Sequence, residues 1–166
     1  MIILGIDPGL AIVGYGVIEY KNMKFRTLAY GAITTPAHTP VEKRLQKIYS
    51  ELDAIIKKHR PDEIAVEELF FNTNITTGIT VAEARGVILL AAVQNGLSIN
   101  EYTPLQVKQS VVGYGKAEKN QVILMVKTLL KLDKAPRLDD TCDALAIAIC
   151  HAHTGKSGLK DYYNLK

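Results

Sequence analysis

The sequence opens with a short apolar run that ends in a carboxylate and a turn, Ile2-Ile3-Leu4-Gly5-Ile6-Asp7-Pro8-Gly9. A run of this length bounded by turn residues is typical of a buried strand in the middle of a sheet. Asp7 then lies at the carboxyl end of that strand, where open α/β sheets place their ligand sites. An aspartate that only caps the turn explains this stretch equally well, so further carboxylates at the same edge must decide.

The segments that follow predict an antiparallel meander and then a helix. Residues 14–20 and 25–34 are rich in β-formers and are separated by the polar stretch 21–24, which favours a hairpin. Thr39-Pro40-Val41-Glu42 predicts a capping box with proline at the first helical position, and Pro61 ends the helix. The spacing of its apolar residues predicts a buried face made of Val41, Leu45, Ile48, Tyr49, Leu52, Ile55 and Ile56.

A second strand, over residues 63–68, also ends in carboxylates, Glu67 and Glu68. After a helix, such a strand returns parallel to the first through a right-handed crossover, which brings its end to the edge that carries Asp7. Successive strand residues face opposite sides of a sheet, so only one of the two glutamates can join Asp7. This is the second carboxylate to reach the edge.

The remaining segments complete an α/β fold. We expect a loop over 69–77, a helix over 78–95, a strand over 97–102, a short helix from Pro104, a basic helix over 117–132 and a last helix from about 138. The prediction is a five-stranded mixed sheet, three antiparallel strands followed by two parallel ones, with helices on both faces. One domain covers 1–153, and 154–166 form a flexible tail. In the second helix, Gly78, Ala82 and Gly86 recur every four residues, which favours core packing or, alternatively, a subunit interface.

The last helix supplies three more acids near its start, Asp139, Asp140 and Asp143. Acidic residues at a helix N-terminus are favoured by the helix dipole, which accounts for Asp139. Asp140 and Asp143 are three residues apart and so are neighbours on one face, and Asp143 lies deeper in an otherwise apolar helix. Asp7, Glu67, Asp140 and Asp143 are therefore the candidate cluster.

Four carboxylates cannot converge while ionised unless cations compensate them. An all-oxygen site selects Mg²⁺ or Mn²⁺, and a pair of such ions supports in-line phosphoryl displacement. The sequence has no P-loop, no glycine-rich dinucleotide fingerprint and no Cys/His cluster with zinc spacing. His151 and His153 alternate on a helix and point apart, so we treat them as surface or packing residues.

Composition and charge agree with a globular protein that meets a polyanion. The 166 residues are 48% apolar and 22% charged, without a run of the ~20 apolar residues that span a membrane, and the two cysteines fit a reducing compartment. We therefore expect a cytoplasmic protein. Residues 104–137 hold seven lysines or arginines against two acids. This imbalance favours a polyanionic partner, although a solvated helix face alone would also explain it.

Several of these segments resemble the bacterial RuvC Holliday junction resolvases. The resemblance rests on the stretches Gly5–Gly9 with Gly14-Tyr15-Gly16, Val66–Phe70, Glu83–Gly86, Gln106–Gln109 with Val111–Gly113, Lys116–Lys119 and Asp140–Ala148, and extends to about residue 153. It implies an RNase H-like fold and a homodimer that makes paired, Mg²⁺-dependent nicks in four-way DNA junctions during recombination and repair. It also implies two Mg²⁺ per site, replaceable by Mn²⁺, and RuvA and RuvB as branch-migration partners.

The same resemblance assigns roles to individual residues. Asp7, Glu67, Asp140 and Asp143 match the catalytic, metal-binding acids, which favours Glu67 over Glu68. Lys108 and Lys119 match DNA-contacting lysines, Phe70 matches an aromatic near the junction centre, and we expect Lys116 to neutralise phosphates with them.

Three other functions share part of this pattern. A sugar-kinase or actin-like ATPase also begins with a strand ending in aspartate and glycine, but needs a second domain. A catalytically silent DNA-binding module would keep the lysines and lose the acids. An RNase H acting on RNA–DNA hybrids shares the acids and stays the main alternative.

Overall fold

The structure is a computed structural model and describes residues 1–68 and 75–155. Its elements, in chain order, are β1 (Ile2–Asp7), β2 (Ile12–Lys21), β3 (Lys24–Thr34), α1 (Val41–His59), β4 (Glu63–Glu67), α2 (Ile75–Gln94), β5 (Ser98–Tyr102), α3 (Pro104–Val112), α4 (Lys119–Leu129) and α5 (Asp139–Thr154). No helix in these described ranges is long and apolar enough to cross a membrane.

The five strands form one mixed sheet in the order β3-β2-β1-β4-β5. β1 pairs antiparallel with β2, and β2 pairs antiparallel with β3, which gives the predicted meander. β4 runs parallel to β1 on its other side, and β5 runs parallel to β4. The predicted sheet is confirmed, and β1 is its central strand, so Asp7 ends the strand with neighbours on both sides.

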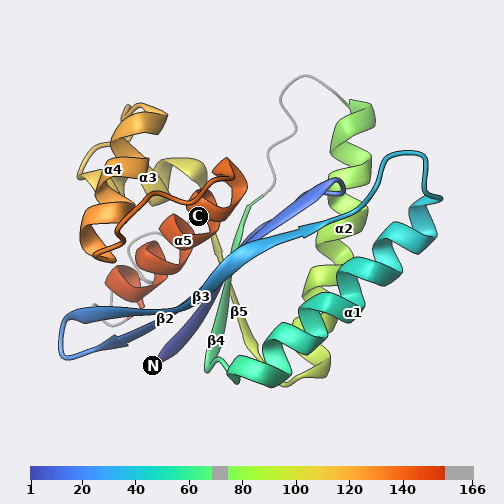
Figure 1. The fold of residues 1–166 in the computed structure, drawn as a ribbon, viewed down its shortest axis with the longest axis horizontal. Helices are drawn as coiled ribbons and strands as arrows, with labels where there is room; N and C mark the ends of the chain where they lie inside the picture. Colours follow the sequence, from blue (N-terminus) through green and yellow to red (C-terminus); the bar gives the residue numbers. More distant parts are fainter. Residues whose placement is uncertain (69–74, 156–166) are drawn as a thin grey trace, which may run out of the picture.

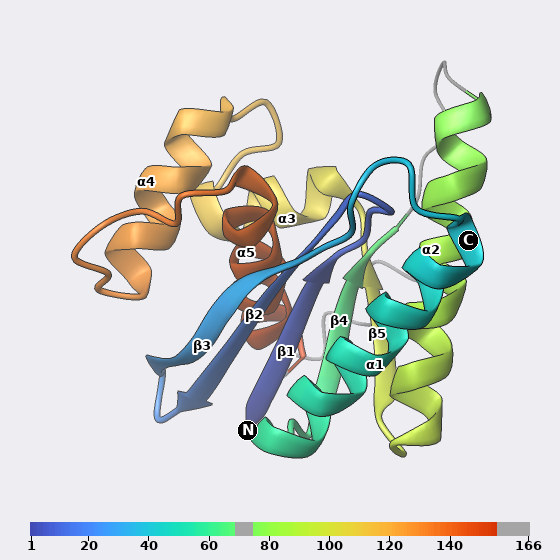
Figure 2. The same cartoon turned by 45° about the vertical axis from the view of Figure 1, so that its right-hand side comes forward.

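Helices cover both faces of the sheet (Figures 1 and 2). α1 and α2 pack side by side on one face, and α3, α4 and α5 lie on the other. Two hydrophobic cores follow from this arrangement. The core under α1 and α2 includes Leu4, Ile6, Ile64 and Val66, whereas the core under α5 includes Ile3 and Ala65. Alternate residues of β1 and β4 thus enter alternate cores, as the two-residue strand period requires.

The start of α1 differs from the prediction. Pro40 occupies the N-cap position, and no side chain caps the helix there, so the expected capping box at Thr39 is wrong. The predicted apolar face is buried in its middle, at Ile48, Leu52 and Ile56, while Val41 is 37% exposed. Val41 is not part of the core under α1 and α2, whereas Leu45 and Ile48 are packed in it. Arg60 ends the helix in a left-handed conformation just before Pro61.

α5 is the helix most deeply enclosed, because the strands below it carry glycines. A Cβ on Gly5 would lie 2.1 Å from the Ala144 carbonyl oxygen, and one on Gly14 would lie 2.0 Å from that of Asp140. Only glycine permits this approach of helix to strand. α5 consequently packs directly on β1 and β2, and its first turn reaches the carboxyl end of β1.

The two histidines of α5 are packing residues, as expected. His151 is completely buried, with Nδ1 2.7 Å from Tyr102 Oη and Nε2 2.8 Å from Glu63 Oε2. His153 packs edge-on against Phe25. α5 continues through Thr154, one residue past the predicted domain end, and residues 156–166 of the predicted tail lie outside the described residues.

Candidate active site

Strand alternation turns Asp7 and Glu67 toward α5. Gly5 faces α5, and Asp7 follows it by two residues on the same side of β1. Glu67 follows Ala65 by two residues on β4, and Ala65 belongs to the core under α5. Glu68 lies beyond the end of β4, where its backbone N–H donates to the Tyr102 carbonyl. The prediction that Glu67, and not Glu68, joins Asp7 agrees with this register.

α5 brings Asp140 and Asp143 to the same place from above. Both lie in its first two turns, where the close approach at Gly14 holds the helix against the sheet. The charges of Glu67, Asp143 and Asp140 all act on Asp7, so two strand ends and one helix converge as the sequence indicated.

The convergence concentrates negative charge that the described cations offset only in part. Burial, followed by repulsion from Glu67, Asp143 and Asp140, raises the pKa of Asp7 from 3.8 to about 8. Burial and the charge of Asp143 raise the pKa of Glu67. Burial also raises the pKa of Asp143, although Lys119 opposes the shift. A carboxylate cluster in this state either takes up protons or binds cations.

The donor chemistry fits a hard divalent cation, since every candidate ligand is a carboxylate oxygen. In the described ranges no three Asp, Glu, His or Cys side chains are already arranged around a common ion position. Glu67, Asp140 and Asp143 are nevertheless near enough to Asp7 to raise its pKa, so the acids lie within electrostatic reach of Asp7.

Lys119 contacts this cluster directly. Its Nζ lies 3.1 Å from Asp143 Oδ2 and 3.2 Å from Asp139 Oδ2. Its charge also opposes the rise in the pKa of Asp7 and of Glu67 without cancelling it. The sequence pointed to Lys119 as a DNA contact but missed these ion pairs, and it gave Asp139 no role besides the helix dipole. The only signal in the sequence for these ion pairs was that α4 begins with a basic residue and α5 begins with acidic ones.

A cavity of about 210 Å³ adjoins the acids between α3, α4 and α5. Its lining combines two lysines, two of the acids and an apolar wall: Lys108, Lys119, Glu67, Asp143, Pro104, Val107, Val122 and Ile147. Lys108 therefore lies beside the cluster, and its contact with DNA stays a prediction. Lys116 is exposed in the segment between α3 and α4. Phe70, the predicted junction contact, lies outside the described residues, as does most of the predicted loop 69–77, within which α2 begins at Ile75.

The family model of crossover junction endodeoxyribonuclease RuvC matches residues 3–151. The chain belongs to the RuvC family. Among its relatives, the crossover junction endodeoxyribonuclease RuvC of Clostridioides difficile is 61% identical over 156 residues, covering 94% of this chain and 92% of the relative. That of Alkaliphilus oremlandii is 61% identical over 155 residues, covering 93% and 94%.

Solved structures agree with the RuvC assignment. Thermus thermophilus RuvC in complex with a Holliday junction substrate has a TM-score of 0.91 at 38% identity and covers 95% of this chain and 96% of its own. The yeast mitochondrial Holliday junction resolvase Ydc2 has a TM-score of 0.65 at 15% identity, with 98% and 83% covered, and shares the fold. The predicted RNase H-like architecture is thereby confirmed.

Proposed function

We propose that this RuvC chain is a Holliday junction resolvase that introduces paired, symmetric nicks into four-way DNA junctions during homologous recombination and DNA repair. The observation that carries the proposal is the convergence of Asp7, Glu67, Asp140 and Asp143 on the α5 face of the sheet, beside Lys108 and Lys119. The match to RuvC over nearly the whole chain supports the same conclusion.

Membership in a nuclease family of this kind implies a divalent metal, and we assign two Mg²⁺ to the site, with Mn²⁺ as a substitute. Asp7, Glu67, Asp140 and Asp143 would hold the ions. When bound, the ions supply activation of water and stabilisation of charge on the attacking and leaving oxygens of the phosphodiester. The protein's contribution is the rigid support, because Asp7 and Glu67 are fixed by strands and the two aspartates by a packed helix.

The basic residues around the acids would position the DNA. Lys108 and Lys119 line the cavity that contains Glu67 and Asp143, and Lys116 is exposed nearby. Lysines neutralise phosphates without reading base identity, so they hold the strand in register with the acids. The proposal also includes the prediction that Phe70 contacts the DNA near the junction centre.

Two symmetric nicks require two sites, and α2 offers a surface for a homodimer. Five of its exposed positions are spaced by four, three, four and three residues: Ile79, Glu83, Gly86, Leu90 and Val93. This is the spacing of a helix–helix seam, and Ile79, Leu90 and Val93 are 54%, 51% and 61% exposed. The central Gly86 has open space where a Cβ would be, which leaves room for a partner helix.

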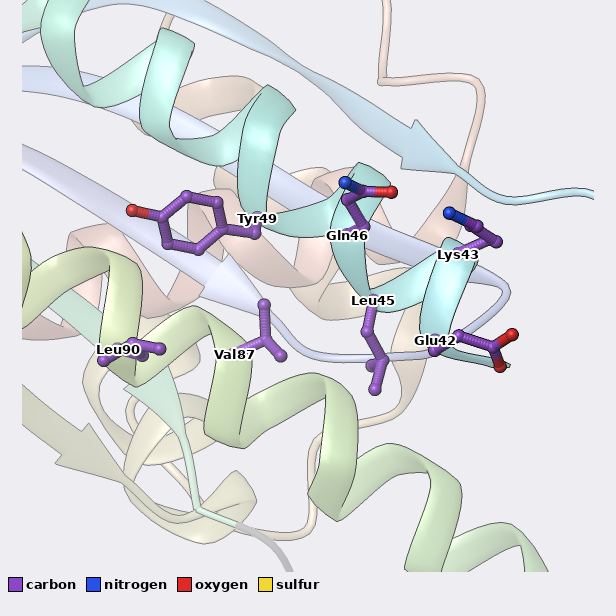
Figure 3. Close-up of a pocket in the computed structure, with 7 residues that line it drawn as sticks. All are labelled: Glu42, Lys43, Leu45, Gln46, Tyr49, Val87 and Leu90. Carbon is purple, nitrogen blue, oxygen red and sulfur yellow. The ribbon is translucent and has the colours of Figure 1, made fainter. Parts of the chain in front are cut away.

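This seam is not the small-residue face of Gly78, Ala82 and Gly86 that the sequence indicated. The two sets of residues share only Gly86. Leu90 also borders a groove between α1 and α2, together with Leu45, Tyr49 and Val87 (Figure 3). Glu42, Lys43 and Gln46 form the polar part of the groove lining. A partly apolar groove beside an exposed helix seam fits a two-fold interface, which would present two acid clusters to one junction. RuvA and RuvB as partners and a cytoplasmic location stay predictions.

The decisive experiment offers one four-way junction, its linear duplex and an RNA–DNA hybrid of the same sequence to the protein with Mg²⁺. We expect paired nicks in the junction and little cleavage of the other two. Asp7→Asn should abolish nicking while junction binding is kept or tightened, because a negative charge near the phosphate is removed. Preferential cleavage of the hybrid would favour the RNase H alternative instead.

A further inference from the structure

The first residue of α4 directs its charge at the acid cluster rather than into solvent. Lys119 Nζ lies 3.1 Å from Asp143 Oδ2 and 3.2 Å from Asp139 Oδ2, with half of its side chain still exposed. Among the described residues, no other basic side chain forms an ion pair with Asp7, Glu67 or Asp143.

We propose that Lys119 is an internal counter-cation that competes with the divalent metal for Asp143, and that its displacement couples metal binding to DNA binding. The inference deepens the proposed function and rests on it, because it takes Asp143 as a metal ligand. Lys119 would thus have two alternating partners, the Asp143 carboxylate in the free protein and a DNA phosphate in the complex.

The competition follows from the geometry at one oxygen. Asp143 Oδ2 accepts a hydrogen bond from the Lys119 ammonium. A divalent ion on the same carboxylate would lie within a few ångströms of that ammonium, and two cations so close repel each other strongly. Metal binding at Asp143 therefore weakens its ion pair with Lys119, and the ammonium can then leave or retreat to Asp139 alone.

The surroundings allow Lys119 to leave without moving the backbone. α4 is held at its start by the Gln121 side chain, whose Oε1 accepts from the Glu118 backbone N–H at 2.8 Å. The side chain of Lys119 lines the cavity of about 210 Å³ that also contains Lys108. The ammonium can therefore swing into space already lined by a second lysine, where a DNA phosphate would be bound by both.

Coupling between the two ligands is reciprocal by thermodynamic necessity. If metal binding releases Lys119 for DNA, then DNA that draws Lys119 away from Asp143 must tighten metal binding by the same factor. The free protein would hold metal weakly, and the junction complex would hold it well. The nuclease site would then be completed mainly when a substrate is present.

The first test measures Mn²⁺ affinity without DNA, using the electron paramagnetic resonance signal of free Mn²⁺. Lys119→Met should bind Mn²⁺ about threefold to fivefold more tightly than the wild type, the upper part of the range expected for losing a partly exposed ion pair. Lys119→Arg keeps the charge and should stay within about twofold of the wild type. Lys57→Met is the matched control, because it removes an exposed lysine–aspartate pair, with Asp53 at 2.6 Å on α1, and should change nothing.

The second test measures junction affinity in Ca²⁺ and in EDTA. The ratio of the two dissociation constants reports the coupling, and it should be several-fold larger for the wild type than for Lys119→Met. Equal or weaker Mn²⁺ binding by folded Lys119→Met, or equal tightening by Lys119→Arg, would overturn the proposal. If Lys119→Met does not fold, Lys119→Gln takes its place with the same expected result. A wild type that binds no Mn²⁺ and cleaves no junction would instead refute the proposed function.

Discussion

Replacing the central acid should stabilise the metal-free protein. Asp7→Asn keeps the shape of the side chain and removes a charge that burial and three neighbouring carboxylates disfavour. Because its pKa in the folded protein is raised from 3.8 to about 8, Asp7 contributes most to stability in acid and progressively less as the pH rises toward 8. In Asp7→Asn this carboxyl group is absent, so the stability of the variant does not fall with rising pH for this reason.

The size of the effect follows from linkage. One proton taken up on folding changes the stability by about 1.4 kcal/mol for each pH unit between the two pKa values, which gives roughly 4 kcal/mol at pH 7. The destabilisation is smaller than this if the ionised Asp7 carboxylate rotates toward water, because it is then less buried. We therefore expect Asp7→Asn to exceed the wild type by about 1–4 kcal/mol at pH 7–8 and by little at pH 4.

The assay is urea unfolding in EDTA at pH 4 to 8, with Asp133→Asn as the control because it removes an exposed acid away from the cluster. Adding Mg²⁺ should then stabilise the wild type and leave Asp7→Asn unchanged, since only a folded site with its ligand binds the ion. If Asp7→Asn were no more stable than the wild type at pH 8 in EDTA, the four acids would not repel one another as described.

Four further results are expected. Glu67→Gln should lower cleavage by several orders of magnitude with the fold intact, whereas Glu68→Gln should stay within about tenfold, under roughly 1.4 kcal/mol in barrier; the reverse order in a junction assay would mean that β4 is displaced by one residue. Mn²⁺ should replace Mg²⁺ in cleavage and Ca²⁺ should permit only binding, and full activity in excess EDTA would contradict the metal assignment. Cys142 and Cys150 are buried with thiol pKa values raised by burial to about 12, so a thiol reagent at pH 8 should react with neither until the protein is unfolded. If the proposed homodimer forms along α2, Leu90→Glu should shift the protein from dimer to monomer in light scattering without changing its circular dichroism, and an unaltered mass would place the interface elsewhere.

Local patterns in the sequence were sufficient for the sheet and for the acids on it. The apolar run before Asp7 and the one before Glu67 each define a strand and its end, and the two-residue period decides which glutamate faces α5. The hairpin between β2 and β3 and the helix that carries Asp140 and Asp143 are equally local. These features depend on neighbours within a few residues, so a sequence alone determines them.

Contacts between distant segments required the tertiary structure. The approach of α5 to Gly5 and Gly14 places the aspartates above Asp7, and nothing in either segment by itself specifies the partner. The ion pair of Lys119 with Asp143 joins two helices whose charges, in sequence, look like ordinary solvated termini.

The capping box predicted at the start of α1 shows where local patterns stop being sufficient. The box at Thr39 is wrong because Pro40, in an extended conformation, itself occupies the N-cap position. The exposed residues of α2 are those that the packed elements leave uncovered. The spacing of apolar and acidic residues can be read along the chain. Which face of a helix stays exposed to solvent depends on how all the helices and strands pack together.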